Sequence, residues 1–178
     1  RYEGTVSNLM GDGIMALFGA PLAHEDHAVR ACYAALRMQE SVNRYADGVR
    51  RTEGVPIQIR VGINSGEVVV GAIGNDLKMD YTAVGQTTHL AARMEQMAMP
   101  GSVLAAADTI RLVEGYVEAK SLGEMTIKGL DNPVEVFEIT EGGFERTRLQ
   151  AAASRGLTPF VGRELEVQQL AQALDQAR

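Results

Sequence analysis

The sequence predicts an α+β fold in which helices cover one face of a mostly antiparallel sheet, as in ferredoxin-like α/β sandwiches. Short apolar runs separated by tight turns are typical of hairpins, which excludes a purely parallel sheet. Runs with the 3.6-residue period of an amphipathic helix alternate with these strands. The 178 residues, 46% of them hydrophobic and 22% charged, suffice for one domain with a substantial core and part of a second.

The first two strands are predicted at 4–10 and 14–18, with Gly11, Asp12 and Gly13 between them. Asp-Gly between two apolar runs is a strong hairpin signal, because the turn needs a positive φ. A tight tip flanked by glycine exposes the carboxylate of Asp12 and lets a ligand come close to the backbone. Asp12 is therefore either an ordinary turn residue or a metal ligand.

Residues 25–47 predict an amphipathic helix that ends before a polar loop bracketed by Gly48 and Gly54. Its apolar positions at helical spacing are Val29, Cys32, Tyr33 and Leu36. Residues 57–63 then alternate between apolar and polar side chains, as a half-buried strand does. Turn residues separate them from a second apolar run at 67–73, so we expect these two strands to form a hairpin with each other.

The rest of the chain predicts further short elements, then a linker. They are a loop at 74–80, a strand at 81–84, a helix at 87–98, a strand at 103–105, a helix at 107–113 and strands at 116–127 and 134–139. Residues 142–158 change character, because two glycines are followed by charged and small residues typical of an exposed linker. An amphipathic run with Leu165, Leu170 and Leu174 follows.

The overall charge limits the classes of partner. The formal net charge is −6, and nucleic-acid binding needs a basic face, so nucleic acid is not the expected partner. A nucleotide is compatible with this charge, since it brings magnesium that carboxylates can hold. The lone cysteine, Cys32, excludes an internal disulfide and fits a reducing cytoplasm. No apolar run approaches the ~20 residues of a membrane span.

Four sequence blocks carry a family resemblance. They are MGDGIMALFG (10–19), VGINSGEVVVGAIG (61–74), DYTAVGQTTHLAARME (80–95) and MTIKGLDNPVEVFEI (125–139). In this order they resemble the signature blocks of class III adenylate/guanylate cyclases. The tail PFVGRELEVQQLAQAL (159–174) is similar, over a shorter stretch, to the beginning of AAA/STAND-type ATPase domains. We therefore expect a cyclase domain without its first strand at 1–141, a linker at 142–158 and the start of an ATPase domain at 159–178.

The resemblance implies an enzyme that joins the ribose 3′ oxygen of ATP to its own α-phosphate, which gives cyclic AMP and pyrophosphate. Two divalent ions per site, Mg²⁺ or Mn²⁺, can activate the hydroxyl and stabilise the leaving oxygens. Asp12 matches the second of the family's two metal aspartates. The first belongs to a strand upstream of residue 1, so we do not expect these residues alone to turn over.

The helix predicted at 87–98 carries two further candidates. His89 and Arg93 are four residues apart and share one helical face. Arg93 matches a family arginine that stabilises the transition-state phosphate, a role that suits a permanently charged guanidinium. His89 stands where the family usually has a ribose-orienting asparagine, and an imidazole can still hydrogen-bond a ribose oxygen. The alternatives are a salt bridge of Arg93 with Glu95 or Asp80, and a histidine without a ligand.

Base and triphosphate contacts are implied at other positions. Thr82 matches the threonine version of the family's base-selecting residue, while Asn8 stands where the family has a lysine. An amide can hydrogen-bond adenine N1 or N6 but carries no charge. Lys128 matches a lysine near the triphosphate, or is an ordinary solvated lysine at a strand end. Gly11 and Gly13 let phosphates approach the hairpin backbone.

The resemblance also implies a homodimer with its sites at the interface, in a bacterial, cytoplasmic signalling protein. One chain supplies the metal residues and the other the ribose and arginine contacts, so two-fold symmetry gives two equivalent sites. Two alternatives stay open. The first, motivated by Asn8 and His89, is a degenerate cyclase that senses nucleotide or dimerises and controls the downstream ATPase. The second, an unrelated ferredoxin-like enzyme such as a diguanylate cyclase, ranks last because the sequence has no GGDEF-like hairpin.

Overall fold

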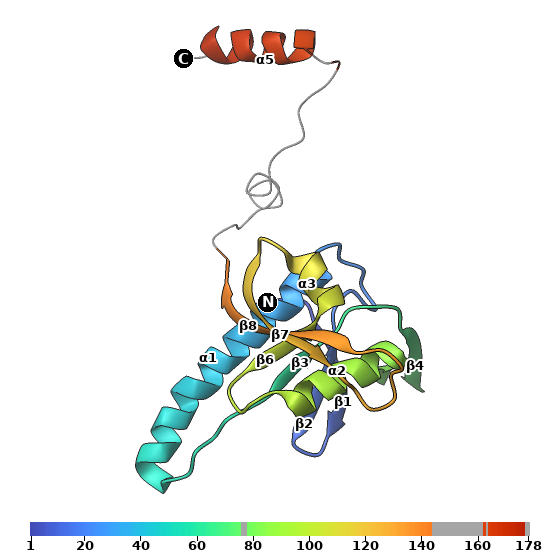
Figure 1. Ribbon diagram of the computed structural model, residues 1–178, viewed down its shortest axis with the longest axis vertical. Helices are drawn as coiled ribbons and strands as arrows, with labels where there is room; N and C mark the ends of the chain where they lie inside the picture. The colour runs from blue at the N-terminus through green and yellow to red at the C-terminus, as the bar shows by residue number, and fades with distance from the viewer. Residues whose placement is uncertain (76–77, 144–161, 163, 177–178) are drawn as a thin grey trace.

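The computed structural model describes residues 1–75, 78–143, 162 and 164–176 (Figure 1). The strands are β1 (Thr5–Met10), β2 (Gly13–Leu17), β3 (Val61–Ile63), β4 (Val69–Asn75), β5 (Lys78–Val84), β6 (Val103–Ala106), β7 (Val117–Met125) and β8 (Val134–Gly142). The helices are α1 (His27–Glu53), α2 (Gln86–Met97), α3 (Ala107–Val113) and α5 (Glu164–Gln176). The predicted α+β class is confirmed.

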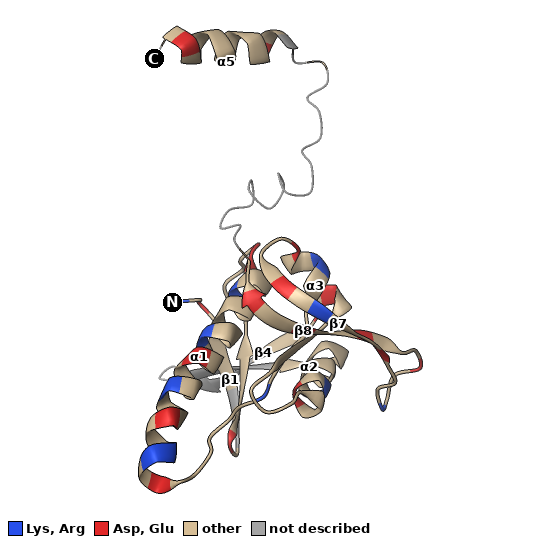
Figure 2. Cartoon of the chain, turned by 60° about the vertical axis from the view of Figure 1, so that its left-hand side comes forward, with Lys and Arg blue, Asp and Glu red and all other residues tan. Residues whose placement is uncertain are grey.

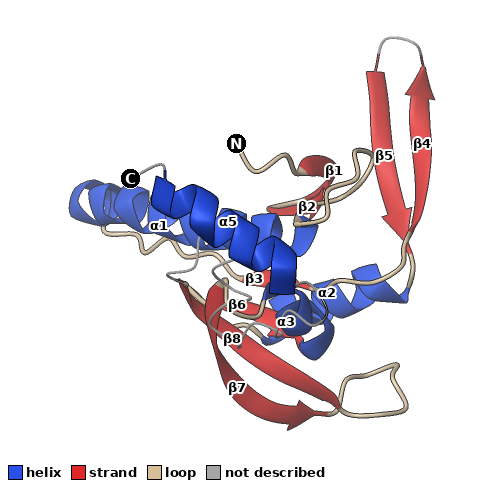
Figure 3. Ribbon diagram, turned by 90° about the horizontal axis from the view of Figure 1, so that it is seen from above, coloured by secondary structure: helices blue, strands red, loops and turns tan. Residues whose placement is uncertain are grey.

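The strands form three separate groups in the described part of the chain. One sheet has the order β3-β6-β8-β7, and β1-β2 and β4-β5 are hairpins. The β3–β6 pair is parallel and the other pairs are antiparallel, which confirms a mostly antiparallel arrangement. β1 lies alongside β5, and the β4–β5 hairpin extends away from the four-stranded sheet (Figure 3).

The core lies on both faces of strand β6, whose four residues are all buried. Val103 and Ala105 belong to a cluster with α1 and α3, whereas Leu104 and Ala106 belong to a cluster with Met94 of α2. Because successive strand residues point to opposite faces, α1 and α2 cover opposite faces of this sheet. The prediction of helices on one face was therefore wrong.

Helix α1 continues through Gly48, so the predicted helix end at residue 47 and the polar loop after it were wrong. A glycine inside a helix costs about 1 kcal/mol but does not terminate it. Gly54 ends the helix because its φ of 72° is left-handed, and its N–H donates to Arg50 O. The exposed side of α1 carries charges of both signs, including the Arg50–Asp47 ion pair (Figure 2).

The hairpin predicted between 57–63 and 67–73 is also wrong. In this stretch β3 covers 61–63, and it pairs with β6 instead of β4. The alternating residues before β3 are extended without a strand partner. Ile59 O accepts hydrogen bonds from Gln39 Nε2 and Gly101 N. The alternation matched the partial burial of this segment, but the predicted strand was wrong over 57–60 and its neighbour was not identified.

The loop predicted at 74–80 is largely strand. β4 and β5 pair from Val69↔Val84 to Asn75↔Lys78, so the hairpin is longer than its apolar residues indicated. Of the predicted linker, Gly142 ends β8 and Gly143 N donates to Tyr116 O, while 144–158 lie outside the described residues. The amphipathic run with Leu165, Leu170 and Leu174 forms helix α5. In the described part of the chain, no helix has the length and apolar character needed to cross a bilayer.

Candidate active site

The β1–β2 hairpin presents Asp12 at its tip. Met10 and Gly13 are paired, which leaves Gly11 and Asp12 as a two-residue turn, and Asp12 is exposed. Gly11 has a φ of 63°, and the space where its Cβ would lie is open. The glycine is therefore needed for its backbone conformation, and the open tip lets a ligand approach. Gly13 is the first residue of β2 and lies outside the turn that was predicted to contain it.

The N-terminus of α2 is held by hydroxyl groups and by an amide. Thr87 Oγ1 donates to Glu67 O at 2.7 Å, and Thr88 Oγ1 donates to Gly85 O at 2.7 Å. Asn64 Nδ2 donates to Thr87 O at 3.2 Å, which ties the end of β3 to the first turn of α2. Sequence reasoning did not single out these three side chains. For Thr87 and Thr88, the signal was a pair of threonines at the start of a predicted helix.

Helix α2 presents His89 and Arg93 on its outer side. Met94 is fully buried, whereas His89 is exposed and Arg93 is half-buried. Arg93 Nη1 donates to Gln96 Oε1 at 2.6 Å. Glu95, considered as an ion partner of Arg93, lies 2.9 Å from Arg60 instead. A guanidinium with five donors keeps others for a ligand after this contact.

The remaining predicted residues lie on strands and a loop. Thr82 stands opposite Gly71 in the β4–β5 ladder, and Asn8 stands opposite Met15 next to a bulge in β1. The side chains of Thr82 and Asn8 lie outside what the structure describes. Lys128 is exposed in the loop between β7 and β8. Because β1 lies alongside β5, Asn8 and Thr82 belong to neighbouring strands.

The described residues do not form a complete metal site. Among them, no group of three or more His, Cys, Asp or Glu side chains is arranged to hold an ion. A hard divalent cation takes about six oxygen ligands, usually with more than one carboxylate. The exposed carboxylate of Asp12 suits such an ion chemically, but it fits as one ligand of a site that needs others.

Neither of two cavities described in the molecule contains a predicted site residue. One, of about 340 Å³, lies beside the start of α1. The other, of about 590 Å³, lies between the middle of α1 and the end of β8. Asp12 at the hairpin tip, His89 on α2 and Lys128 thus lie on open surface in one chain.

Comparison with known proteins identifies the matched region. The model of the adenylate and guanylate cyclase catalytic domain matches residues 6–141. Adenylate cyclase 1 from Rhizobium meliloti (strain 1021) is 32% identical over 141 residues, which are 78% of this chain and 21% of that protein. Guanylate cyclase soluble subunit beta-2 from Rattus norvegicus is 34% identical over 126 residues, which are 66% of this chain and 18% of that protein.

A solved structure shares the fold. The crystal structure of the adenylyl cyclase CyaB from P. aeruginosa matches with a TM-score of 0.72 at 29% identity, over 79% of this chain and 73% of that one. The chain spans about a fifth of the length of the two curated relatives. Asp12, Thr82, His89, Arg93 and Lys128 all lie inside the matched range.

Proposed function

Because the chain belongs to the adenylate and guanylate cyclase catalytic domain family, we propose that its full-length protein converts ATP into 3′,5′-cyclic AMP and pyrophosphate. Family membership supports nucleotidyl cyclase activity, which includes both adenylate and guanylate cyclases. The preference for ATP rests on Thr82 and on the adenylate cyclase relative. The observation that carries the proposal is that the matched range holds both an exposed carboxylate at a hairpin tip and an arginine on the outer side of α2.

The reaction forms a bond between the ribose 3′ oxygen and the α-phosphorus, and it breaks the bond from that phosphorus to pyrophosphate. Negative charge grows on the α-phosphate oxygens and on the leaving group. Arg93 donates N–H groups to these oxygens and offsets their growing charge. His89, one turn before Arg93, hydrogen-bonds the ribose. The 3′ hydroxyl gives its proton to solvent water as its oxygen attacks.

Asp12 holds one side of a metal site. When bound, two Mg²⁺ or Mn²⁺ ions would offset the charge of the triphosphate and of the attacking oxygen. We propose that a second aspartate comes from a strand beside β2 or β3. In support, β2 pairs with β1 and β3 pairs with β6, while the second edge of each has no partner among the described strands.

The nucleotide contacts follow from the same arrangement. Asn8 and Thr82 hydrogen-bond the adenine edge, and Lys128 offsets triphosphate charge. Gly11 and Gly13 admit the phosphates to the hairpin tip, where the open space around Gly11 favours a close approach. The exposure of Lys128 leaves its ammonium accessible to a ligand.

We propose a homodimer in which each site takes Asp12 from one chain and Arg93 from the other. Large apolar side chains are exposed on the strands that carry the site, including Val6, Ile14 and Val69, whose exposed fractions are 57%, 63% and 76%. Exposed apolar residues in neighbouring strands are typical of an interaction surface. The open surface around the candidate residues also favours a site that a second chain completes.

We also propose a further domain after this one and a cytoplasmic location. Helix α5 exposes Leu165, Leu170 and Leu174 in the described structure, which supports a further domain, such as an ATPase, packing on it. The buried free thiol of Cys32 is compatible with a reducing cytoplasm.

A degenerate, nucleotide-sensing domain is the second candidate. Asn8 and His89 favour it, because neither residue matches the family's lysine and asparagine. Such a domain would bind ATP without turnover and pass the signal through its dimer interface to the following segment.

The test is nucleotide conversion by the full-length protein with ATP or GTP in the presence of Mg²⁺ or Mn²⁺. We expect cyclic AMP, and we expect Asp12→Asn and Arg93→Ala to lower kcat by about 10²-fold or more. Arg111→Ala, at an exposed arginine on α3, is the matched control and should keep full activity. ATP binding without any cyclic product would contradict the proposed cyclase activity and support the nucleotide-sensing domain.

A further inference from the structure

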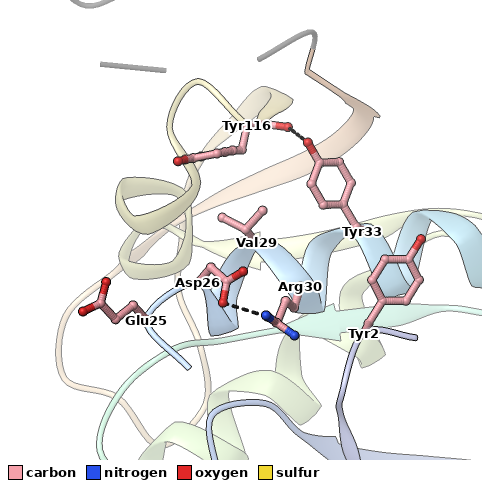
Figure 4. Close-up of a pocket in the computed structure, with 7 residues that line it drawn as sticks. All are labelled: Tyr2, Glu25, Asp26, Val29, Arg30, Tyr33 and Tyr116. Atoms are coloured by element: carbon pink, nitrogen blue, oxygen red, sulfur yellow. Dashed lines mark hydrogen bonds and ion pairs between the residues drawn. The ribbon is translucent and has the colours of Figure 1, made fainter. Parts of the chain in front are cut away.

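A cavity of about 340 Å³ lies beside the start of α1, and Figure 4 shows its lining. Side chains come from the segment before β1, from α1 and the residues just before it, and from the turn between α3 and β7. No residue assigned to the nucleotide site lines this cavity. The cavity is therefore separate from the proposed nucleotide site.

Tyrosine is concentrated in this cavity. The sequence has five tyrosines and no tryptophan, and Tyr2, Tyr33 and Tyr116 all line the cavity. Tyr33 Oη donates to the carbonyl oxygen of Tyr116 at 2.9 Å, which fixes α1 against the turn before β7. The guanidinium carbon of Arg1 lies 5.7 Å from the centroid of the Tyr2 ring. That ring already attracts one cation, as electron-rich aromatic faces do.

The rim of the cavity carries more negative than positive charge. Glu25 and Asp26 contribute carboxylates, and Arg30 contributes a guanidinium. Arg30 donates through Nε to Asp26 at 2.7 Å and through Nη1 to Glu3 at 2.5 Å. Arg30 thus has two acidic partners, and Glu25 is a further carboxylate among the residues that line the cavity. The hydrogen bond from Arg30 lowers the pKa of Asp26, so this carboxylate is charged at neutral pH.

We propose that this cavity binds a small organic cation that carries a methylated ammonium group. A methylated ammonium is weakly hydrated and is attracted to the faces of tyrosine rings. The carboxylates at the rim complement its charge, and the volume matches the lower end of small-molecule sites. The same carboxylates disfavour an anion, and a neutral molecule of this shape gains nothing from them.

The test uses choline and its neutral carbon analogue, 3,3-dimethyl-1-butanol, in calorimetric titrations of the full-length protein. We expect saturable choline binding at one site per chain, with a Kd on the order of 1 mM. The alcohol should bind at least about tenfold more weakly, since it has the shape without the charge. Cyclase activity is not the readout, so this result does not depend on the proposed catalytic function.

Variants distinguish ligand binding from a packing role of these residues, because the proposal predicts the direction in which choline affinity changes. Tyr116→Leu should weaken choline binding about tenfold, because one ring is lost. Tyr45→Leu, at a tyrosine of α1 that is 66% exposed and outside the cavity, should leave it unchanged. Arg30→Gln should tighten binding several-fold, since it removes the like charge beside the ligand.

The proposal is overturned by any of three results: no saturable choline binding, equal binding of the alcohol, or weaker choline binding in Arg30→Gln. Thermal unfolding followed by circular dichroism shows whether each variant folds. If Tyr116→Leu does not fold, the direction of the change in Arg30→Gln still decides the question.

Discussion

Gly62 of β3 lies against the backbone of α2: a Cβ on Gly62 would stand 2.2 Å from the carbonyl oxygen of Ala91. The same Cβ would also stand 2.2 Å from Glu95 N, so both neighbours are backbone atoms of one helix. A side chain at this position therefore displaces α2 as a unit. Because α2 carries His89 and Arg93, the absence of a side chain at Gly62 sets where both lie relative to the sheet.

Gly62→Ala should destabilise the domain by about 1–3 kcal/mol, since overpacking forces the backbone to shift. In the full-length protein it should also lower nucleotide conversion, because Arg93 moves with α2. Gly71→Ala is the matched control: no atom lies within 4 Å of its added Cβ. Urea unfolding measures the first effect. Equal unfolding midpoints for Gly62→Ala and Gly71→Ala would show that the helix is not held by this contact.

The hydrogen bond from Tyr33 to Tyr116 O joins α1 to the turn before β7. Tyr33→Phe removes this donor and leaves a partly buried carbonyl without it, so we expect a loss of about 1 kcal/mol in unfolding free energy. Tyr45→Phe, on the exposed part of α1, serves as the control and should change little. Chemical denaturation of both variants makes the comparison, and identical midpoints would contradict the assigned bond.

The burial of Cys32 makes the free energy of unfolding depend on pH in the alkaline range. Its side chain is fully buried, and burial raises the pKa of the thiol to about 12. In the unfolded chain the pKa is about 8.5, so the unfolded state loses this proton first as the pH rises. The contribution of the buried thiol is complete below about pH 8.5 and is lost progressively towards pH 12.

We therefore expect the unfolding free energy to fall more steeply between about pH 8.5 and 10.5 in the wild type than in Cys32→Ala. The slopes are compared, because the absolute stabilities also differ in packing. A thiol reagent at neutral pH should modify Cys32 in urea but not in the native protein. Parallel slopes, or rapid modification of the native protein, would mean that the thiol is accessible.

Local patterns predicted the ends of the molecule's elements well where turn chemistry was explicit. Asp12 and its neighbouring glycines gave the β1–β2 hairpin, and helical spacing around Tyr33 gave α1. They failed at Gly48, because a single glycine weakens a helix by about 1 kcal/mol without terminating it, and α1 ends only at the left-handed Gly54. They also failed for β3, because alternation identifies an extended segment but not its partner.

The candidate site was predictable in part for the same reason. The side of α2 that carries His89 and Arg93 follows from helical periodicity, and the exposure of Asp12 follows from its turn. The contacts that hold α2 join residues far apart in the sequence, as Asn64 and Thr87 do. No periodicity reports such contacts, and the close approach of Gly62 to the backbone of α2 was equally hidden.

We propose that Asp12 of one chain and Arg93 of its partner form one site. The activity of full-length dimers assembled from equal amounts of Asp12→Asn and Arg93→Ala chains tests this proposal. Half of such dimers are mixed and each mixed dimer holds one intact site, so we expect about a quarter of wild-type activity. A mixture no more active than the two variants measured separately would contradict it.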